Sequence, residues 1–158
     1  ALPILAKYPH QAQCARALGI DSIHLITEGK TSDALRQFTA GRGVDVAFDT
    51  IGSTVAVTDA AEALRPGGTL VLLAAPGGRV IMPLTHLVWK EARVLGSNCY
   101  GWSGLTRDFD SAIELIASGA LNPTALITHR FPLADAQAAF DTAASKASGS
   151  IKVIIRNA

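Results

Sequence analysis

The sequence predicts an α/β protein with a parallel sheet and helices on both faces, and three observations indicate this class. Short apolar segments alternate with helical patterns along the chain, which is typical of repeated strand–helix units. The stretch 41–78 contains one complete strand–helix–strand unit. The second strand of that unit, LVLLAA, is apolar on both faces, as a central parallel strand must be when helices cover both sides.

The strand–helix–strand unit can be followed residue by residue. A strand at 44–48 ends at the segment DTIG (49–52), and Ser53 or Thr54 caps a helix that runs to about Leu64. Apolar residues fall at helical spacing along this helix, and the segment RPGG (65–68) ends it because proline cannot continue a helix. A strand at 69–75 follows. The carboxyl ends of such strands are the usual place for a ligand.

The remaining elements alternate in the same way. Further strands are expected at 2–6, 22–26, 93–97, 126–131 and 151–156. Helices are expected at 9–18, after a cap at Thr31 or Ser32 with Leu35 and Phe38 on one face, at 84–91, at 106–118, and at 134–144 with Phe140 on the buried face. We therefore expect one domain with a substantial core, which 158 residues are enough to form.

Composition excludes several classes of function. The net charge is +1 and no segment concentrates lysine and arginine, which argues against binding to a nucleic-acid backbone. No apolar run approaches the roughly 18 residues of a membrane span. Cys14 and Cys99 are too few for a disulfide scaffold and, like the four histidines, lack metal-ligand spacing. We expect a cytoplasmic protein in which both thiols are small buried residues and His24 is a satisfied core or edge residue.

The motifs DTIG, LRPGGTLVLLAAPGG and the tail from LIASGALNPTALITHRFPL to IKVII occur in this order along the chain. In this order they resemble the medium-chain dehydrogenase/reductase family, the superfamily of zinc-type alcohol dehydrogenases and quinone reductases. The resemblance covers essentially the whole chain but only the C-terminal half or so of such an enzyme. It implies a partial Rossmann domain at 1–125, lacking the first strand and its Gly-rich turn, and a return segment at 126–158 toward an absent GroES-like catalytic domain.

The resemblance also implies which residues bind a nicotinamide dinucleotide. These cofactor-binding candidates are Thr50, Ile51, Gly52, Ala74, Ala75, Pro76, Ser97, Asn98, Cys99 and Lys152. For each there is a plainer interpretation: a strand-to-helix turn, tight helix–sheet packing, or a solvated lysine. No catalytic residue and no metal ligand is assigned, since the zinc ligands of the family would lie upstream of this chain.

The end of the first expected strand bears on which dinucleotide is bound. In Rossmann enzymes an acidic residue there binds the ribose hydroxyls of NAD. The corresponding position by resemblance is Ala6, and Lys7 and Tyr8 follow it. A lysine attracts the 2′-phosphate of NADP, which a carboxylate would repel. We therefore expect NADP rather than NAD, with Lys7 and Tyr8 as further cofactor-binding residues; a solvated lysine at a strand end is the alternative.

Function follows from the resemblance as an expectation. The complete protein would transfer a hydride between the nicotinamide cofactor and a small alcohol, aldehyde, ketone or quinone, and the 158 residues alone would be inactive. Two alternatives stay open: a non-catalytic Rossmann remnant that assembles with partner chains, and a methyltransferase, which shares the RPGG turn. The strand at 93–97 is expected at the sheet edge, where the family commonly dimerises, with Leu87, Val88 and Trp89 covering the seam. A homodimer, or a tetramer built from dimers, is therefore expected.

Overall fold

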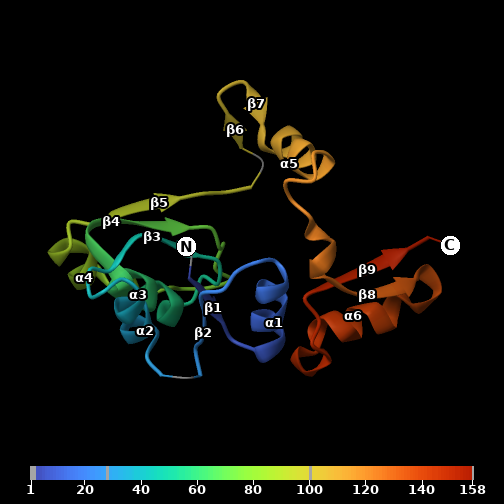
Figure 1. The fold of residues 1–158 in the computed structure, drawn as a ribbon, viewed down its shortest axis with the longest axis horizontal. Coiled ribbons are helices and arrows are strands. Elements are labelled where there is room, and N and C mark those ends of the chain that lie inside the picture. Colours follow the sequence, from blue (N-terminus) through green and yellow to red (C-terminus); the bar gives the residue numbers. More distant parts are fainter. Residues whose placement is uncertain (1–2, 28, 100, 158) are drawn as a thin grey trace. The chain divides into compact units, whose positions relative to one another are not determined.

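The computed structural model describes residues 3–27, 29–99 and 101–157 (Figure 1). The chain divides into two compact units. The continuous unit is Ile26–Gly101, and the split unit combines Ala1–Leu25 with Trp102–Ala158. Within the described ranges, no helix is both long enough and apolar enough to cross a membrane.

The continuous unit contains three strands and three helices. They are α2 (Thr31–Phe38), β3 (Val44–Asp49), α3 (Thr54–Ala63), β4 (Leu64–Leu72), α4 (Leu84–Trp89) and β5 (Arg93–Gly96). The strands form one parallel sheet in the order β3-β4-β5, so that β4 is central and β5 lies at the edge, as the sequence predicts. The parallel α/β class is therefore confirmed.

Helix α3 supplies most of the core of this unit. Ser53 caps it, since the Ser53 hydroxyl accepts a hydrogen bond from the Ala56 N–H at 3.2 Å. The predicted apolar stripe is buried, with Val57 1% exposed and Ala61 fully enclosed. These side chains pack with Leu64, Leu70 and Leu87 in one cluster. α3 packs directly on the sheet, and α2 and α4 flank it (Figure 1).

The segment RPGG ends α3 as predicted, but it does not form a separate turn before the strand. Strand β4 already begins at Leu64, runs through this segment and stops at Leu72 rather than at 75. The register shifts between Val44 and Val46 of β3, opposite residues 65–68. Gly43 permits this arrangement, because a Cβ there would lie 2.7 Å from the Arg65 nitrogen. The two backbones approach too closely for any other residue.

The two faces of the sheet differ in burial. Leu70 on the α3 side is fully buried. On the opposite face Val46, Phe48 and Leu95 are 44%, 57% and 54% exposed. Within this unit, helices therefore cover one face of the sheet, whereas the sequence predicts helices on both faces.

The split unit contains the remaining elements. They are β1 (Ile4–Ala6), α1 (Pro9–Ala17), β2 (Ile23–Leu25), β6 (Trp102–Ser103), β7 (Thr106–Arg107), α5 (Asp108–Ala117), β8 (Ile127–Pro132), α6 (Ala136–Ala144) and β9 (Lys152–Arg156). β1 pairs in parallel with β2, β8 pairs in parallel with β9, and β6 and β7 form a short antiparallel hairpin that the sequence pattern did not predict. Leu2, the first residue of the strand expected at 2–6, lies outside the described residues.

The missing first strand accounts for the division of the parallel strands. A Rossmann sheet places its first strand between the second and the fourth. Here β1 and β2 form a sheet of their own and β3, β4 and β5 form another. The Rossmann-like class lacking its first strand is thus confirmed.

Several details differ from the sequence-based expectations. Phe140 is 68% exposed, and Ala139 is the buried residue of α6 instead. Lys30 rather than Thr31 or Ser32 is the N-cap of α2. His24 is not satisfied, because its Nε2 is buried and makes no hydrogen bond within the described part of the chain. The exposure of Phe140 and the burial of His24 Nε2 depend on which surfaces meet in space, and residue spacing does not encode that.

Candidate functional site: the carboxyl ends of three parallel strands

The candidate site lies where β3, β4 and β5 end. The strand register aligns Asp49 with Leu72, and Leu72 with Gly96. Because the strands are parallel, the segments that follow them leave the sheet at the same edge. Nine of the predicted cofactor-binding residues belong to these segments: Thr50, Ile51, Gly52, Ala74, Ala75, Pro76, Ser97, Asn98 and Cys99.

Backbone hydrogen bonds continue past the strand ends and hold these segments together. The N–H groups of Leu73 and Ala74 both donate to the Asp49 carbonyl, at 2.9 and 3.2 Å. The Ser97 N–H donates to the Leu72 carbonyl at 2.9 Å. The three strand ends therefore form one continuous backbone edge.

Small and exposed residues make this edge accessible. Gly52 has a φ of +70°, and a Cβ there would lie 3.0 Å from the Ala74 Cβ. Thr50 is exposed, and Ile51 has 69% of its surface exposed. Glycine at 52 and alanine at 74 and 75 leave the backbone at these three positions without large side chains.

The segment after β5 is also open. The Asn98 carboxamide oxygen accepts the Cys99 N–H at 2.9 Å and the Cys99 thiol at 3.5 Å. Cys99 is exposed, so its interpretation as a small buried thiol is wrong. It follows an edge strand whose four residues are all exposed. Cys14 is half-buried, and its thiol donates to the Ala125 carbonyl at 3.5 Å.

Lys7 and Tyr8 form a separate cluster in the split unit, directly after β1. The Gln11 side-chain oxygen accepts the backbone N–H groups of both residues, at 3.0 and 3.1 Å. The Lys7 ammonium nitrogen lies 5.4 Å from the centre of the Tyr8 ring. The His10 ring stacks on the Tyr8 ring, with the two ring centres 5.4 Å apart. An exposed cation beside an aromatic ring can bind a phosphorylated nucleotide.

Lys152 also belongs to the split unit. It is exposed and begins β9, where its carbonyl accepts a hydrogen bond from the Thr128 hydroxyl at 3.2 Å. The Thr128 hydroxyl also lies 3.0 Å from His129 Nδ1. Lys7, Tyr8 and Lys152 are thus in a different unit from the nine residues at the strand ends.

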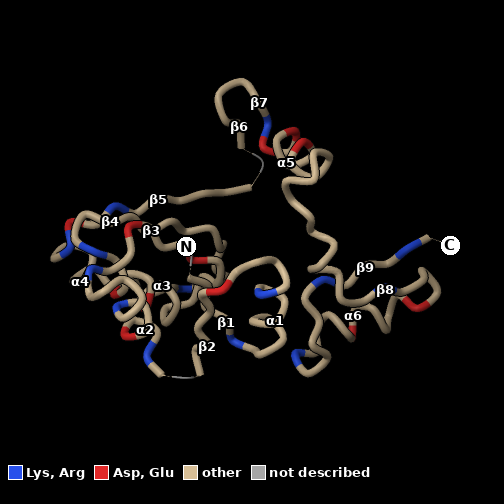
Figure 2. Tube along the Cα trace, viewed as in Figure 1, with Lys and Arg blue, Asp and Glu red and all other residues tan. Residues whose placement is uncertain are grey.

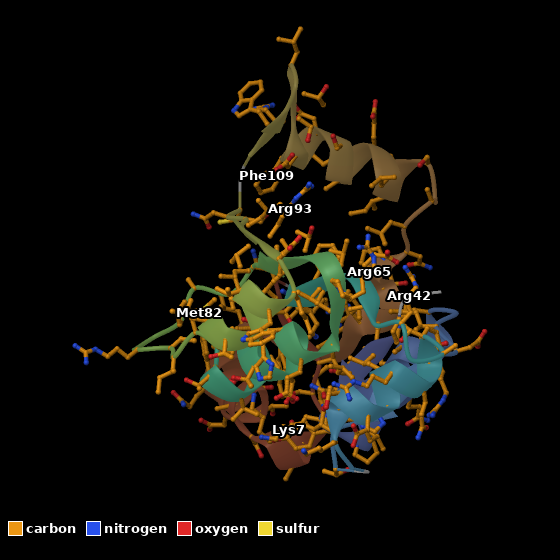
Figure 3. The ribbon with its side chains drawn as sticks, turned by 90° about the vertical axis from the view of Figure 1, so that its left-hand side faces the viewer. Lys7, Arg42, Arg65, Met82, Arg93 and Phe109 are labelled. Carbon is orange, nitrogen blue, oxygen red and sulfur yellow. The ribbon has the colours of Figure 1, made fainter. Side chains whose placement is uncertain are left out.

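Charged side chains lie at the amino ends of β3 and β4, at the other end of the strands from the candidate site. The Asp45 carboxylate accepts hydrogen bonds from both terminal nitrogens of Arg42, at 2.9 and 2.7 Å, and from Arg65 Nε at 2.6 Å. Figure 3 labels the two arginines. These hydrogen bonds, first from Arg42 and then from Arg65, hold the pKa of Asp45 well below its ordinary value. Elsewhere, acidic and basic residues are interspersed along the trace (Figure 2). The ion pairs of Asp45 with Arg42 and Arg65 thus join β3 to β4 at the end of the sheet opposite the candidate site.

The Lys90 side chain lies at the carboxyl end of α3 and hydrogen-bonds to its last carbonyls. Its ammonium donates to the carbonyls of Ala61, Glu62 and Leu64 at 3.0, 2.6 and 2.6 Å. Burial lowers the pKa of Lys90, Arg36 lowers it further, and Glu62 acts in the opposite direction. Three carbonyls at a helix end are thereby satisfied by one cation.

The sequence-based prediction of the site missed the part played by Asp49. This carboxylate is only 4% exposed and accepts hydrogen bonds from the backbone that follows it. The spacing Asp-x-x-Gly signals such a turn, because aspartate commonly bonds to the backbone two residues on.

The described residues offer no zinc site. No three His, Cys, Asp or Glu side chains within these ranges group closely enough to hold a metal ion. At the strand-end edge, a Cβ on Gly52 would lie 3.0 Å from the Ala74 Cβ, so glycine is the residue that fits where the segments after β3 and β4 meet.

The strand order and the edge at the strand ends define a Rossmann-type α/β protein. The sequence profile of the family described as zinc-binding dehydrogenase matches residues 4–118, and the chain therefore belongs to this family. An alcohol dehydrogenase from Cupriavidus necator is 28% identical over 149 residues, covering 93% of this chain and 40% of that protein. A putative D-xylulose reductase from Rhizobium meliloti is 33% identical over 137 residues, covering 87% and 38% respectively.

Solved structures agree on the fold. A short-chain alcohol dehydrogenase from Escherichia coli, in complex with NADH, aligns with a TM-score of 0.78 at 17% identity. The alignment covers 94% of this chain and 42% of that one. The chain thus spans about 40% of the length of the curated relatives that it matches.

Proposed function

We propose that the complete protein is an NAD(P)-dependent oxidoreductase that transfers a hydride between the nicotinamide and a small alcohol, aldehyde, ketone or quinone. One observation carries the proposal: in a member of the zinc-binding dehydrogenase family, three parallel strand ends form an open edge of small and exposed residues. The names of the two curated relatives favour an alcohol or a polyol as substrate. Family membership favours this function over that of a methyltransferase.

In this function the chain binds and orients the cofactor, which carries the hydride chemistry. The residues proposed to meet the nicotinamide half are those after β3, β4 and β5. Lys152 is proposed to meet the pyrophosphate, and residues 126–158 to lead toward the catalytic domain. A metal ion that polarises the substrate oxygen would need ligands from outside the described residues.

Titration of the complete protein with reduced nicotinamide dinucleotides tests this function. We expect binding with enhanced nicotinamide fluorescence, and oxidation of the cofactor when a suitable aldehyde or ketone is added. Failure to bind either NADH or NADPH would contradict the proposal and favour a non-catalytic Rossmann remnant.

We further propose that the cofactor is NADP. Ala6, which is 3% exposed, ends β1 without a carboxylate, and Lys7 presents an exposed ammonium next to it. Gln11 fixes the backbone of Lys7 and Tyr8, so the cation is held on a defined turn. The 2′-phosphate carries roughly two negative charges that this ammonium can attract.

The variants Lys7→Ala and Ala6→Asp, made in the complete protein, test the choice of cofactor. Each should shift discrimination toward NAD by about 1–3 kcal/mol, which corresponds to loss of one charge-assisted contact. Lys146→Ala removes another exposed lysine of the split unit and serves as the matched control. Unchanged discrimination in both test variants would contradict the assignment.

We also propose a homodimer, or a tetramer built from dimers, in which β5 pairs with β5 of a second copy. β5 is an edge strand of its sheet, and its second side, which pairs with no other strand among the described residues, can accept another strand. Val88 and Trp89 beside it are 73% and 83% exposed. Leu87 cannot cover the seam as expected, because it is buried in the core with Leu70.

Light scattering over a dilution series tests the assembly. Trp89→Glu should shift the protein toward the monomer, whereas Trp102→Glu, which changes an exposed tryptophan of the other unit, should not. A strict monomer before any substitution would contradict this proposal.

A further inference from the structure

Asp49 is a buried carboxylate that the cofactor-binding prediction does not use. It ends β3 and is 4% exposed. A carboxylate removed from water is stable only when other groups hydrogen-bond to it. The donors here are backbone groups of the next turn: the Ile51 N–H at 3.0 Å from Oδ1, and the Gly52 N–H at 3.2 Å from Oδ1 and 3.1 Å from Oδ2. The side chain therefore fixes the turn at 50–52.

The main chain of the same residue fixes the neighbouring strand end. The Asp49 carbonyl accepts the N–H groups of Leu73 and Ala74, just beyond the end of β4. One residue thus holds two segments, the turn through its carboxylate and the end of β4 through its carbonyl.

The two segments held by Asp49 are in close contact. A Cβ on Gly52 would lie 3.0 Å from the Ala74 Cβ and 3.5 Å from Pro76. A displacement of the turn at 50–52 toward β4 would therefore press against the segment 74–76, and the two segments would have to move together. The hydrogen bonds of Asp49 join β3 to both of these segments.

We propose that Asp49 is a positioning residue, which sets the spacing between the segments 50–52 and 74–76 and so shapes the place where the nicotinamide ring binds. This inference rests on the proposed dinucleotide-binding function. Asp49 itself is buried and acts through Thr50, Ile51 and Gly52 on one side and Ala74 on the other. Acceptor oxygens are the essential feature of the side chain.

Separate ligands for the two halves of the cofactor distinguish positioning from general stability. In the complete protein, Asp49→Ala should weaken binding of reduced nicotinamide mononucleotide about tenfold, in line with the loss of hydrogen bonds to a charged acceptor. Binding of 2′,5′-ADP, the adenosine half, should stay within about twofold, and an unchanged circular dichroism spectrum shows that the variant is folded. Asp49→Asn keeps one acceptor oxygen and should recover most of the affinity.

Two further measurements complete the experiment. Hydrogen exchange should accelerate at residues 50–52 in Asp49→Ala and much less in Asp49→Asn. Asp45→Ala removes the other carboxylate of β3 and should leave binding of both half-ligands unchanged.

The outcomes separate this inference from the proposed function. Normal affinity of Asp49→Ala for the mononucleotide, or equal loss for both half-ligands, would overturn the positioning role while dinucleotide binding stands. If the unmodified protein binds neither half-ligand nor the dinucleotide, the proposed function fails first, and the positioning role fails with it.

Discussion

Alanine substitutions of three glycines in the continuous unit test how closely its backbone segments approach one another. Gly41, Gly52 and Gly43 have φ values of +82°, +70° and +86°, so alanine meets a similar left-handed backbone at each. Their surroundings differ. A Cβ on Gly41 meets nothing within 4 Å, one on Gly52 meets the Ala74 Cβ at 3.0 Å, and one on Gly43 meets backbone atoms at 2.7, 2.9 and 2.9 Å.

The expected losses in the free energy of unfolding follow from these contacts. The left-handed conformation costs alanine about 1–2 kcal/mol, but alanine also lowers the conformational entropy of the unfolded chain, which offsets part of this cost. Gly41→Ala should therefore lower the free energy of unfolding by about 1 kcal/mol. Gly52→Ala adds a tight side-chain contact and should cost about 2–4 kcal/mol. Gly43→Ala should exceed about 4 kcal/mol, because the backbones of β3 and β4 would have to separate.

Urea denaturation of the three variants measures this order. Gly52→Ala should in addition weaken binding of the reduced nicotinamide mononucleotide, whereas Gly41→Ala should not. If Gly41→Ala were as destabilising as Gly43→Ala, backbone conformation alone would explain the losses and the close-approach argument would fail. Equal stability of Gly41→Ala and Gly52→Ala would show that Ala74 moves aside freely.

Two further predictions concern charged groups of the continuous unit. Lys90→Met should lower the free energy of unfolding by about 2 kcal/mol, because three carbonyls at the end of α3 lose their donor; an unchanged urea midpoint would contradict this. The pKa of Asp45 is lower in the folded protein than its ordinary 3.8, so the unfolded chain takes up a proton first as the pH falls. Stability is therefore lost as the pH falls through 3.8 and below, and Asp45→Asn should flatten this fall in urea titrations at acidic pH. An equally steep fall in the variant would show that Asp45 is not responsible.

Local pattern was sufficient to predict the strand–helix–strand unit. The Ser53 cap and the burial of Val57 and Ala61 follow from residue type and spacing within a few residues. The central place of β4 follows from its apolar residues on both faces, and the edge place of β5 from chain order in a parallel sheet. The alignment of the three strand ends follows from the same parallel order.

Spacing could not predict which polar groups the fold would bury. The sequence shows an aspartate at the end of a strand, but only the turn of Ile51 and Gly52 back over Asp49 makes it a buried acceptor. In the same way, Lys90 satisfies carbonyls that lie 26 to 29 residues earlier in the chain. The hydrogen bonds of Lys90 join atoms from distant parts of the sequence, so no local rule contains them.

The sequence by itself determined the α/β class, the order of the elements and the family to which the chain belongs. Tertiary structure decided where β4 begins, because Gly43 and Gly68 let two backbones approach more closely than a turn motif implies. It also decided that Phe140 and Cys99 are exposed. Elements form from contacts between near neighbours in sequence, whereas burial depends on surfaces that only the folded chain brings together.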